Sequence, residues 1–269
     1  MKRFRIFRGK QAVATLAPDE RGLAYGDGLF ETMRIDRGGV PWWPRHRERL
    51  AEGARRLGIA PPDDTWLDAR VAEIVAGVDK GVAKLVLTRG AGGRGYLPPE
   101  SLEPTVLLSV HPLAEMRAAG LDVVWSPIRL GVQPVLAGIK HLNRLEQVLA
   151  RREAAAAGAD EAVMLDIDGR VVCATAANVI VLCGSDWLTP PVSGSGVAGV
   201  CRGWLLEQGL AREAALLPAQ VEAAQAIILC NAVRGILPVA RLDGRGLPHA
   251  PAIDSIIGAL HRAMPAFAR

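Results

Sequence analysis

The chain has 269 residues, half of them hydrophobic, so it can bury a substantial core in one large domain or two ordinary ones. The net charge of +4 comes from scattered arginines, and only two tyrosines and four phenylalanines are available to stack on bases. Both features argue against a nucleic-acid partner. The positive charge is compatible with a small anionic substrate. No apolar run approaches the roughly 20 residues of a membrane-spanning helix, and residues 1–10 lack an apolar secretory core, so we expect a cytoplasmic protein without a membrane partner.

The residues up to 114 alternate predicted strands and helices. Period-two alternation and apolar runs predict four strands, over residues 4–9, 28–35, 83–90 and 105–110. A helix is predicted over residues 44–58, because the segment begins at a proline and ends at a glycine, and a second helix over 66–78. This order predicts an α/β domain over residues 1–114.

Between two of these strands lies a long glycine- and proline-rich loop, "AGGRGYLPPESLEP", residues 91–104. Loops of this length in compact domains are often functional. Arg89 and Arg94 are therefore candidate ligands for an anion.

The pattern loosens around residues 112–120, which predicts a junction at 115–124 between the first domain and a second over 125–269. The second domain is expected to contain a helix over 143–158 and a hairpin over 161–175 with an Asp-Gly turn. Further elements are expected in chain order, namely strands over 121–125, 178–183, 186–189, 226–231 and 235–242, and helices over 200–214 and 251–264.

Four cysteines, Cys173, Cys183, Cys201 and Cys230, are spread through this second domain without metal-ligand spacing. We expect reduced thiols and no metal site.

Residues 194–199, "GSGVAG", fit the G-x-G-x-x-G dinucleotide fingerprint. A Rossmann fold requires a buried strand that runs directly into the glycines, but Pro190 and Pro191 intervene here. The turn is better interpreted as a phosphate site at a helix N-terminus, with an ordinary loop of small residues as the alternative.

Lys140 is one of only five lysines among 32 basic residues, in a chain that mostly uses arginine where a cation is needed. It lies just before a predicted helix whose apolar stripe is Leu145, Val148 and Leu149. A lysine amine can attack a carbonyl group and an arginine cannot. The residues alone leave two alternatives, a solvated lysine near a helix start and a nucleophile.

The segment around Lys140, "AGIKHLNRLEQVLAR", closely resembles the cofactor-lysine region of aminodeoxychorismate lyases. These belong to the fold-type IV pyridoxal-phosphate enzymes, with the branched-chain and D-amino-acid aminotransferases. Other segments resemble the family in the same order, namely "YGDGLFET", "HRERL", "LTRGAGGRGY", "DEAVMLDIDGRV", "AANVIV", "GVCR" and "CNAVRGILPV". The resemblance spans nearly the whole chain, and the run around Lys140 favours the lyase.

The resemblance implies a two-domain α/β (α+β) fold similar to D-amino-acid aminotransferase, with a small N-terminal domain and a larger cofactor-binding domain with a barrel-like sheet. It implies pyridoxal 5′-phosphate as the cofactor and Lys140 as the Schiff-base lysine. Arg49 would bind the cofactor phosphate, together with backbone N–H groups of Val200 and Cys201 and the backbone of Ala232. The family also implies a homodimer, with the active site between the domains.

One position departs from the family pattern. Relatives carry a glutamate five residues before the asparagine of "AANVIV", where it pairs with the pyridine nitrogen of the cofactor, and this chain has Cys173 there. A thiol is a poor substitute for a carboxylate in that role. A lyase tolerates the change better than an aminotransferase, because aromatisation of the product drives the reaction.

The implied reaction converts 4-amino-4-deoxychorismate to 4-aminobenzoate and pyruvate in folate synthesis. Arg94 and Arg89 are the candidate ligands for the substrate carboxylates, Tyr25 and Phe30 are expected to shape the pocket, and Thr32 is a candidate proton donor. Two alternatives stay open: a fold-type IV aminotransferase acting on D- or branched-chain amino acids, and a cofactor-binding homologue that has lost activity.

Overall fold

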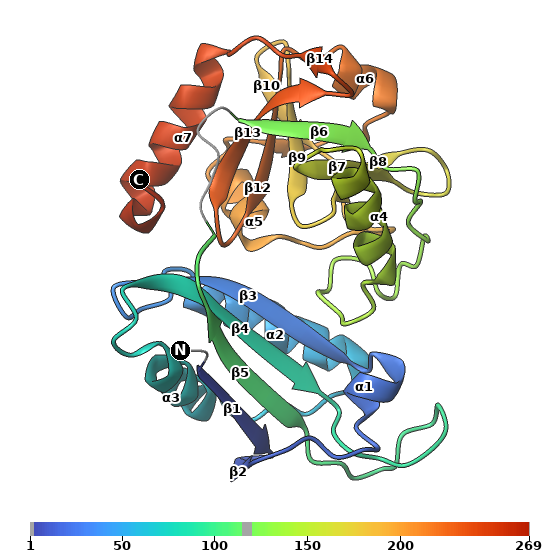
Figure 1. Cartoon of the computed structure of the whole chain (residues 1–269), viewed down its shortest axis with the longest axis vertical. Coiled ribbons are helices and arrows are strands. Elements are labelled where there is room, and N and C mark those ends of the chain that lie inside the picture. The colour runs from blue at the N-terminus through green and yellow to red at the C-terminus, as the bar shows by residue number, and fades with distance from the viewer. Residues whose placement is uncertain (1–2, 115–119, 269) are drawn as a thin grey trace. The chain divides into compact units, whose positions relative to one another are not determined.

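The computed structural model describes residues 3–114 and 120–268 (Figure 1). The chain divides into two compact units, each with its own sheet and helices, which confirms the α/β class. The first unit comprises Met1–Ala114 together with Ile139–Asn143, and the second comprises Glu115–Gly138 and Arg144–Arg269. Residues 115–119 of the expected junction lie outside the described residues, so the junction at 115–124 stays a prediction.

An antiparallel sheet of five strands forms the first unit, in the order β2-β1-β5-β4-β3. The strands are β1 (Arg3–Arg8), β2 (Gln11–Val13), β3 (Gly28–Asp36), β4 (Lys80–Thr88) and β5 (Thr105–His111). On β3 the alternation predicted from the sequence is visible, because Leu29, Glu31 and Met33 are buried while Phe30 and Thr32 on the opposite face are partly exposed.

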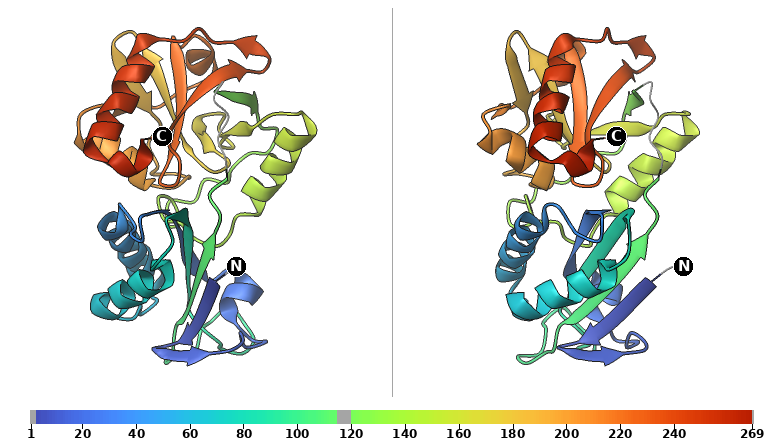
Figure 2. Two further views of the ribbon diagram at one scale, coloured as in Figure 1. Left: turned by 60° about the vertical axis from the view of Figure 1, so that its left-hand side comes forward. Right: turned by 90° about the vertical axis from the view of Figure 1, so that its left-hand side faces the viewer.

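Two helices, α2 (Trp43–Leu57) and α3 (Asp64–Val75), cover one face of this sheet (Figure 2). Helix α2 ends at Gly58, which adopts the left-handed conformation with φ of +63° and donates its N–H to the last turn of the helix. Gly53 lets the helix approach β3, since a Cβ atom there would lie 3.0 Å from two methyl carbons of Leu29. A short helix, α1 (Arg21–Tyr25), leads into β3.

The segment Ile139–Asn143 joins the first unit because it pairs with β3, the strand at the edge of the sheet. The N–H of Phe30 donates to the carbonyl of Lys140 at 2.9 Å, and the N–H of Leu142 donates to the carbonyl of Gly28 at 2.9 Å. These bonds give an antiparallel bridge between Leu29 and His141. The segment therefore serves as a short sixth strand on this edge.

A sheet of nine strands forms the second unit, in the order β11-β10-β9-β12-β13-β6-β7-β8 with β14 paired to β13. The strands are β6 (Leu121–Trp125), β7 (Glu161–Leu165), β8 (Val171–Ala174), β9 (Asn178–Cys183), β10 (Asp186–Thr189), β11 (Arg212–Glu213), β12 (Ala226–Asn231), β13 (Gly235–Leu242) and β14 (Arg245–Gly246). The sheet curls into a half-barrel (Figure 1), and β7 and β8 are buried along their whole length.

Four helices and one 3-10 turn complete the second unit. They are α4 (Leu145–Ala156) on β7, α5 (Val200–Glu207) on β12, α6 (Pro218–Glu222), α7 (Pro251–Ala263) on β13, and the 3-10 turn Pro265–Phe267. The larger apolar core joins β9, β12 and β13, and includes Val179, Ile227 and Val239.

Two sequence predictions about helices are wrong. The helix expected over 200–214 ends at Glu207, because Gly209 takes a left-handed conformation and Arg212–Glu213 pair with β10 as a strand. The expected apolar stripe of α4 is largely on the surface, since Leu145 is 70% and Val148 61% exposed while Ala150 and Ala154 are buried against the sheet.

Within the described residues, no helix is long and apolar enough to cross a membrane, and no group of histidine, cysteine or acidic side chains is arranged to hold a metal ion. All four cysteines are free thiols.

Candidate active site

Lys140 and Phe30 are cross-strand neighbours at the edge of the first sheet. The backbone bond between them fixes the lysine main chain, and the Lys140 ammonium lies 4.1 Å from the centroid of the Phe30 ring. An ammonium group over an aromatic face is attracted by the ring quadrupole. The predicted pocket residue Phe30 therefore supports the predicted nucleophile directly.

A second lysine, which sequence reasoning did not select, shares this ring. Lys84 on β4 lies opposite Thr32 in the antiparallel register, and its Nζ is 5.4 Å from the Phe30 centroid. Because side chains two residues apart on a strand share a face, Phe30 and Thr32 lie on the same side of the sheet as Lys84. The scarcity of lysine in this chain was the signal that could have found Lys84.

On the buried face of β3, Glu31 pairs with two residues of α2. Arg49 donates from Nε to Glu31 Oε1 at 2.8 Å and from Nη2 to Oε2 at 2.5 Å, which is the bidentate arrangement of a guanidinium with a carboxylate. His46 Nδ1 lies 2.6 Å from the same Oε2. Glu31 and His46 are each 1% exposed, and the side chain of Arg49 is 12% exposed.

The charges of this triad, Glu31, His46 and Arg49, depend on burial. Burial raises the pKa of Glu31, but the Arg49 charge and the hydrogen bonds from His46 and Arg49 outweigh it, so the pKa falls to about 2. For His46, burial lowers the pKa, and the bond to Glu31 opposes that effect only in part. The triad thus contains a carboxylate, a guanidinium and a neutral imidazole at neutral pH. Arg49, the predicted phosphate ligand, is held in place by Glu31.

The glycine-rich loop after β4 is fixed to the segment around α1. The buried Arg21 donates from Nη1 to the carbonyl of Gly95 at 2.8 Å and from Nη2 to the carbonyl of Tyr96 at 2.9 Å. Tyr25 accepts a bond from the N–H of Gly95 at 2.9 Å. Tyr25, predicted to shape the pocket, thus uses its hydroxyl to hold this loop.

Arg94, in the same loop, is exposed and has no hydrogen-bond or ion-pair partner in the described part of the chain. Arg89 is in a different situation. It donates to both oxygens of Asp27, at 2.7 and 3.1 Å, and to the carbonyls of Leu57 and Gly58, each at 2.7 Å. Four of the five N–H groups of that guanidinium are therefore engaged. The structure thus shows Arg89 bonded to the end of α2 and to Asp27, and its expected substrate role stays a prediction.

In the second unit, the glycine-rich turn leads into α5 as predicted. Its N-cap is Gly199, and no described side chain caps the first turn, so the backbone N–H groups of Val200 and Cys201 point out of the helix start. A Cβ atom at Gly199 would lie 1.9 Å from Oδ1 of Asn178, and Asn178 Nδ2 donates to the carbonyl of Val197 at 2.9 Å. Asn178, on β9, therefore shapes the turn and requires glycine there.

The start of α5 and the turn after β12 offer backbone groups to a ligand, and their cysteine side chains do not take part. A hydrogen bond with Cys230 and burial raise the pKa of Cys201 well above its usual range, so its side chain stays a thiol. Ala232 is buried beside a turn in which Asn231 Oδ1 accepts the N–H groups of Val233 and Arg234, at 3.0 and 2.8 Å.

Cys173 lies on β8 opposite Met164 of β7, in a buried apolar cluster with Leu130, Ala150 and Val172. The two buried carboxylates of the same hairpin are engaged elsewhere. Glu161 accepts from the N–H groups of residues 162, 175 and 176, and Asp166 accepts from those of residues 168 and 170. Neither carboxylate takes the place of the glutamate that relatives carry.

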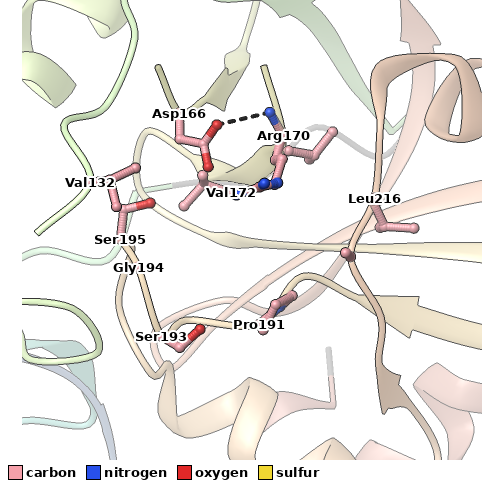
Figure 3. A pocket seen from close by; sticks show the side chains of 11 residues that line it. Val132, Asp166, Arg170, Val172, Pro191, Ser193, Gly194, Ser195 and Leu216 are labelled. Carbon is pink, nitrogen blue, oxygen red and sulfur yellow. Dashed lines mark hydrogen bonds between the residues drawn. The ribbon is translucent and has the colours of Figure 1, made fainter. Parts of the chain in front are cut away.

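The second unit also contains a cavity of about 110 Å³ beside the glycine-rich turn (Figure 3). It is lined by Val132, Asp166, Arg170, Val171, Val172, Pro191, Ser193, Gly194, Ser195, Ala215 and Leu216, none of which is a predicted site residue. Sites for cofactors usually measure about 300 Å³ or more. This cavity is therefore too small to be the cofactor site.

Each unit offers groups that suit pyridoxal phosphate. In the first unit Lys140 offers an amine for the aldehyde and Arg49 a guanidinium for a phosphate, and in the second the glycine-capped start of α5 offers N–H donors for a phosphate. At the position where the family resemblance implies an anion for the ring nitrogen, the second unit has the thiol of Cys173, which is a weak hydrogen-bonding group.

Comparisons with known proteins agree with this chemistry. Residues 28–242 match the family model described as amino-transferase class IV. The chain is 34% identical over 256 residues to the aminodeoxychorismate lyase of Vibrio harveyi, covering 91% of this chain and 92% of that protein. It is 27% identical over 235 residues to the D-alanine aminotransferase of Bacillus licheniformis, covering 84% and 83% of the two chains.

A solved structure, that of the 4-amino-4-deoxychorismate lyase from Pseudomonas aeruginosa, superposes with a TM-score of 0.88 at 38% identity. It covers 97% of this chain and 98% of that one. The predicted family, fold and cofactor are confirmed. The chain belongs to the amino-transferase class IV family, and it is a pyridoxal-phosphate enzyme of fold type IV.

Proposed function

We propose that the protein is an aminodeoxychorismate lyase, which converts 4-amino-4-deoxychorismate to 4-aminobenzoate and pyruvate for folate synthesis. The observation that carries the proposal is the Lys140 amine over the Phe30 ring, in a segment that resembles the lyases around the cofactor lysine. The Vibrio harveyi and Pseudomonas aeruginosa relatives, at 34% and 38% identity, both carry the lyase name.

In this proposal Lys140 bonds the cofactor, and Arg49 and the N–H groups of Val200 and Cys201 bind its phosphate, with the backbone of Ala232 nearby. Glu31 keeps the Arg49 guanidinium in one orientation, which lowers the entropy lost on binding phosphate. Cys173 offers only a thiol toward the ring, so the cofactor nitrogen has no carboxylate partner from this position.

The bound cofactor supplies an electron sink for the carbon that carries the substrate nitrogen. With the cofactor bound, Lys140 Nζ would accept the proton from that carbon. The carbon–oxygen bond to the neighbouring enolpyruvyl group then breaks, the ring becomes aromatic, and a proton returned to the enolpyruvate carbon gives pyruvate. Thr32, on the face of Phe30, is the proposed donor of that proton.

Both products carry carboxylates, so the substrate needs cations. We assign Arg94 and Lys84 as the cations that bind the substrate carboxylates. Arg94 has no described partner, and the ammonium of Lys84 lies near the same Phe30 ring as that of Lys140. Arg89 is left with its anchoring role at Asp27.

Purified protein with added cofactor tests the proposal when it is mixed with 4-amino-4-deoxychorismate. Equal amounts of 4-aminobenzoate and pyruvate are expected, together with a change in the visible spectrum. A parallel sample with D-alanine or leucine plus 2-oxoglutarate tests the aminotransferase alternative, which the Bacillus licheniformis relative keeps open at 27% identity. Formation of glutamate without 4-aminobenzoate would replace the lyase by an aminotransferase. A bound cofactor with neither product would identify a homologue without activity.

We also propose that the protein acts as a cytoplasmic homodimer with no nucleic-acid or membrane partner. The exposed apolar side chains Leu145 and Val148 lie three residues apart on α4, so they share a helix face that a second copy could cover.

A further inference from the structure

We propose that Arg21 is a positioning residue for the substrate: it holds the loop of residues 90–97 so that Arg94 reaches a substrate carboxylate. This inference rests on the proposed function, because it assumes that Arg94 binds the substrate. Arg21 is not among the site residues predicted from the sequence, and it precedes the "YGDGLFET" segment.

Arg21 is buried, with 2% of its surface exposed, and each of its three guanidinium nitrogens donates one hydrogen bond. Its Nε donates to Asp27 Oδ2 at 3.0 Å, and its two terminal nitrogens donate to the carbonyls of Gly95 and Tyr96. The two carbonyls follow Arg94 directly in the chain. The guanidinium is also 4.8 Å from the centroid of the Tyr25 ring. A buried arginine arranged in this way fixes the loop backbone in one place.

Other contacts hold the same loop, one to the segment before α1 and one to the last residue of that helix. The N–H of Gly93 donates to Asp19 Oδ2 at 3.2 Å, and the N–H of Gly95 donates to the Tyr25 hydroxyl. Gly92 lies against the stem of Arg21, where a Cβ atom would be 3.0 Å from Cδ of that arginine. Gly93 and Gly95 have φ values of +68° and +101°, so the backbone can turn sharply on both sides of Arg94.

The side chains on this fixed backbone are largely exposed, although the Tyr96 ring lies 5.7 Å from the Tyr25 ring in an edge-on contact. Tyr96 and Leu97 are 89% and 88% exposed, and Arg94 is exposed without a partner. A loop whose only purpose was to connect β4 to β5 would not need a buried guanidinium to order it. The cost of burying a charge is offset here by the pairing with Asp27 and the two carbonyls. The bonds from Arg21 to the loop therefore hold the backbone beside Arg94 in one place, with the Arg94 side chain exposed.

Arginine is required at this position by geometry. The planar guanidinium reaches one carboxylate and two consecutive carbonyls at once, whereas the ammonium of a lysine is a single point on a flexible stem. Arg21→Lys therefore keeps the buried charge but loses the hold on the loop. Tyr25→Phe removes only the hydroxyl acceptor of Gly95, and it leaves the buried ion pair in place.

The experiment compares these two variants with Arg47→Lys in the cofactor-loaded protein. Arg47 joins α2 to α3 through two bonds to Asp68, at 2.8 and 2.7 Å, so its loss weakens an ion pair of the same unit away from the loop. Hydrogen exchange of the amides in residues 90–97 reports on the loop without reference to the reaction. Steady-state kinetics with 4-amino-4-deoxychorismate report on the substrate, in both the wild-type and the Arg94→Ala background.

We expect faster exchange at residues 93–96 in Arg21→Lys, and to a smaller extent in Tyr25→Phe, but not in Arg47→Lys. We expect Arg21→Lys to raise KM about tenfold with kcat within about twofold, the size of one weakened charged hydrogen bond. In the Arg94→Ala background the same change should alter KM by less than about twofold, because the two residues act through one contact.

The inference is overturned if Arg21→Lys exchanges and turns over like Arg47→Lys, or if its effect on KM is as large without Arg94 as with it. Failure of the proposed function gives a different result, namely no 4-aminobenzoate from the wild-type protein. In that case unchanged exchange in Arg21→Lys would still overturn the loop-holding role, and faster exchange would support it.

Discussion

The ammonium group of Lys140 lies 4.1 Å from the centre of the Phe30 ring, and the carbonyl of the same lysine accepts the backbone N–H of that phenylalanine. Main chain and side chain of the lysine are thus located by the same residue of β3. The backbone bond fixes where the stem begins, and the ring attracts the ammonium at its end.

Replacement of this lysine gives the most direct prediction. Lys140→Ala should abolish both the visible absorbance of the bound cofactor and the formation of 4-aminobenzoate. Lys140→Arg, which keeps a cation over Phe30 but cannot bond the aldehyde, should fail in the same way. Lys80→Ala, at an exposed lysine of β4, serves as the control and should retain both properties. Wild-type absorbance or turnover in Lys140→Ala would end the assignment.

Lys84 should contribute to substrate binding and not to the bond with the cofactor. Lys84→Met should raise KM about tenfold, the size of one charged hydrogen bond, while the absorbance of the bound cofactor persists. Lys84→Arg keeps the cation and should recover most of the loss. A Lys84→Met enzyme with unchanged KM would remove Lys84 from the substrate site.

Cys173 is predicted to face the cofactor nitrogen, where a thiol polarises the ring less than a carboxylate does. Cys173→Ala should retain the lyase rate within about threefold, because a thiol is a weak hydrogen-bonding group. Cys173→Glu should increase amino-group transfer from D-alanine relative to lyase turnover, since a carboxylate stabilises the protonated ring nitrogen. Cys183→Ala, at a partly exposed cysteine of β9, is the control. A ratio of the two activities that does not change in Cys173→Glu would contradict this role.

The buried triad of Glu31, His46 and Arg49 predicts how stability depends on pH. The folded protein holds a proton on His46 less well than the unfolded chain does, so the free energy of unfolding falls as pH drops below about 6.5. Glu31, with a folded pKa of about 2 against 4.5 when unfolded, stabilises above pH 4.5 and loses that contribution toward pH 2. Each proton contributes at most about 1.4 kcal/mol per pH unit.

Urea unfolding between pH 8 and pH 4 measures the part of this dependence that comes from His46. The midpoint should be constant above pH 7 and fall below it, and His46→Gln should flatten the fall between pH 6.5 and pH 5. His249→Gln provides a matched control, because His249 is exposed and pairs with the exposed Asp254. If His46→Gln and the wild type show the same slope, burial of the imidazole is not its source.

The exposed face of α4 predicts self-association. Leu145→Glu combined with Val148→Glu should convert a dimer into a monomer, measured by light scattering after size exclusion. Leu217→Glu, at a side chain 54% exposed beside α6, should leave the mass unchanged. A wild-type protein that elutes as a monomer would refute the proposed homodimer.

Sequence patterns predicted the regular elements well where periodicity and end signals agree. The helix that begins after Trp42 and ends at Gly58 and the strand over Gly28–Asp36 are examples. Motifs also selected Lys140 as the reactive lysine, and that role stays a prediction. The partners of long side chains were not predictable in the same way. An arginine reaches about 6 Å from its Cα, and the spacing of residues in the sequence does not show in which direction its side chain points. Arg89 turned to Asp27, whereas Arg94 stayed exposed.

The same reason explains what the sequence missed. Lys84 and Arg21 acquire their roles from strands and loops distant in the chain, which bring Phe30 and Gly95 to them. The burial of α4 was wrong because small residues, Ala150 and Ala154, face the sheet while larger apolar ones face outward. An apolar pattern on its own does not distinguish side chains that pack in the core from side chains that form an exposed surface for another chain.

The pairing of Ile139–Asn143 with β3 has a consequence for how the protein is made. A fragment released at Ala114 would leave the N–H of Phe30 and the carbonyl of Gly28 without the strand that satisfies them, and such an open edge attracts other chains. Because the segment that pairs with this edge follows Ala114 in the chain, the edge of β3 has no partner until residues 139–143 have been made. The same segment carries Lys140, so pairing of this edge also places the main chain of the predicted nucleophile.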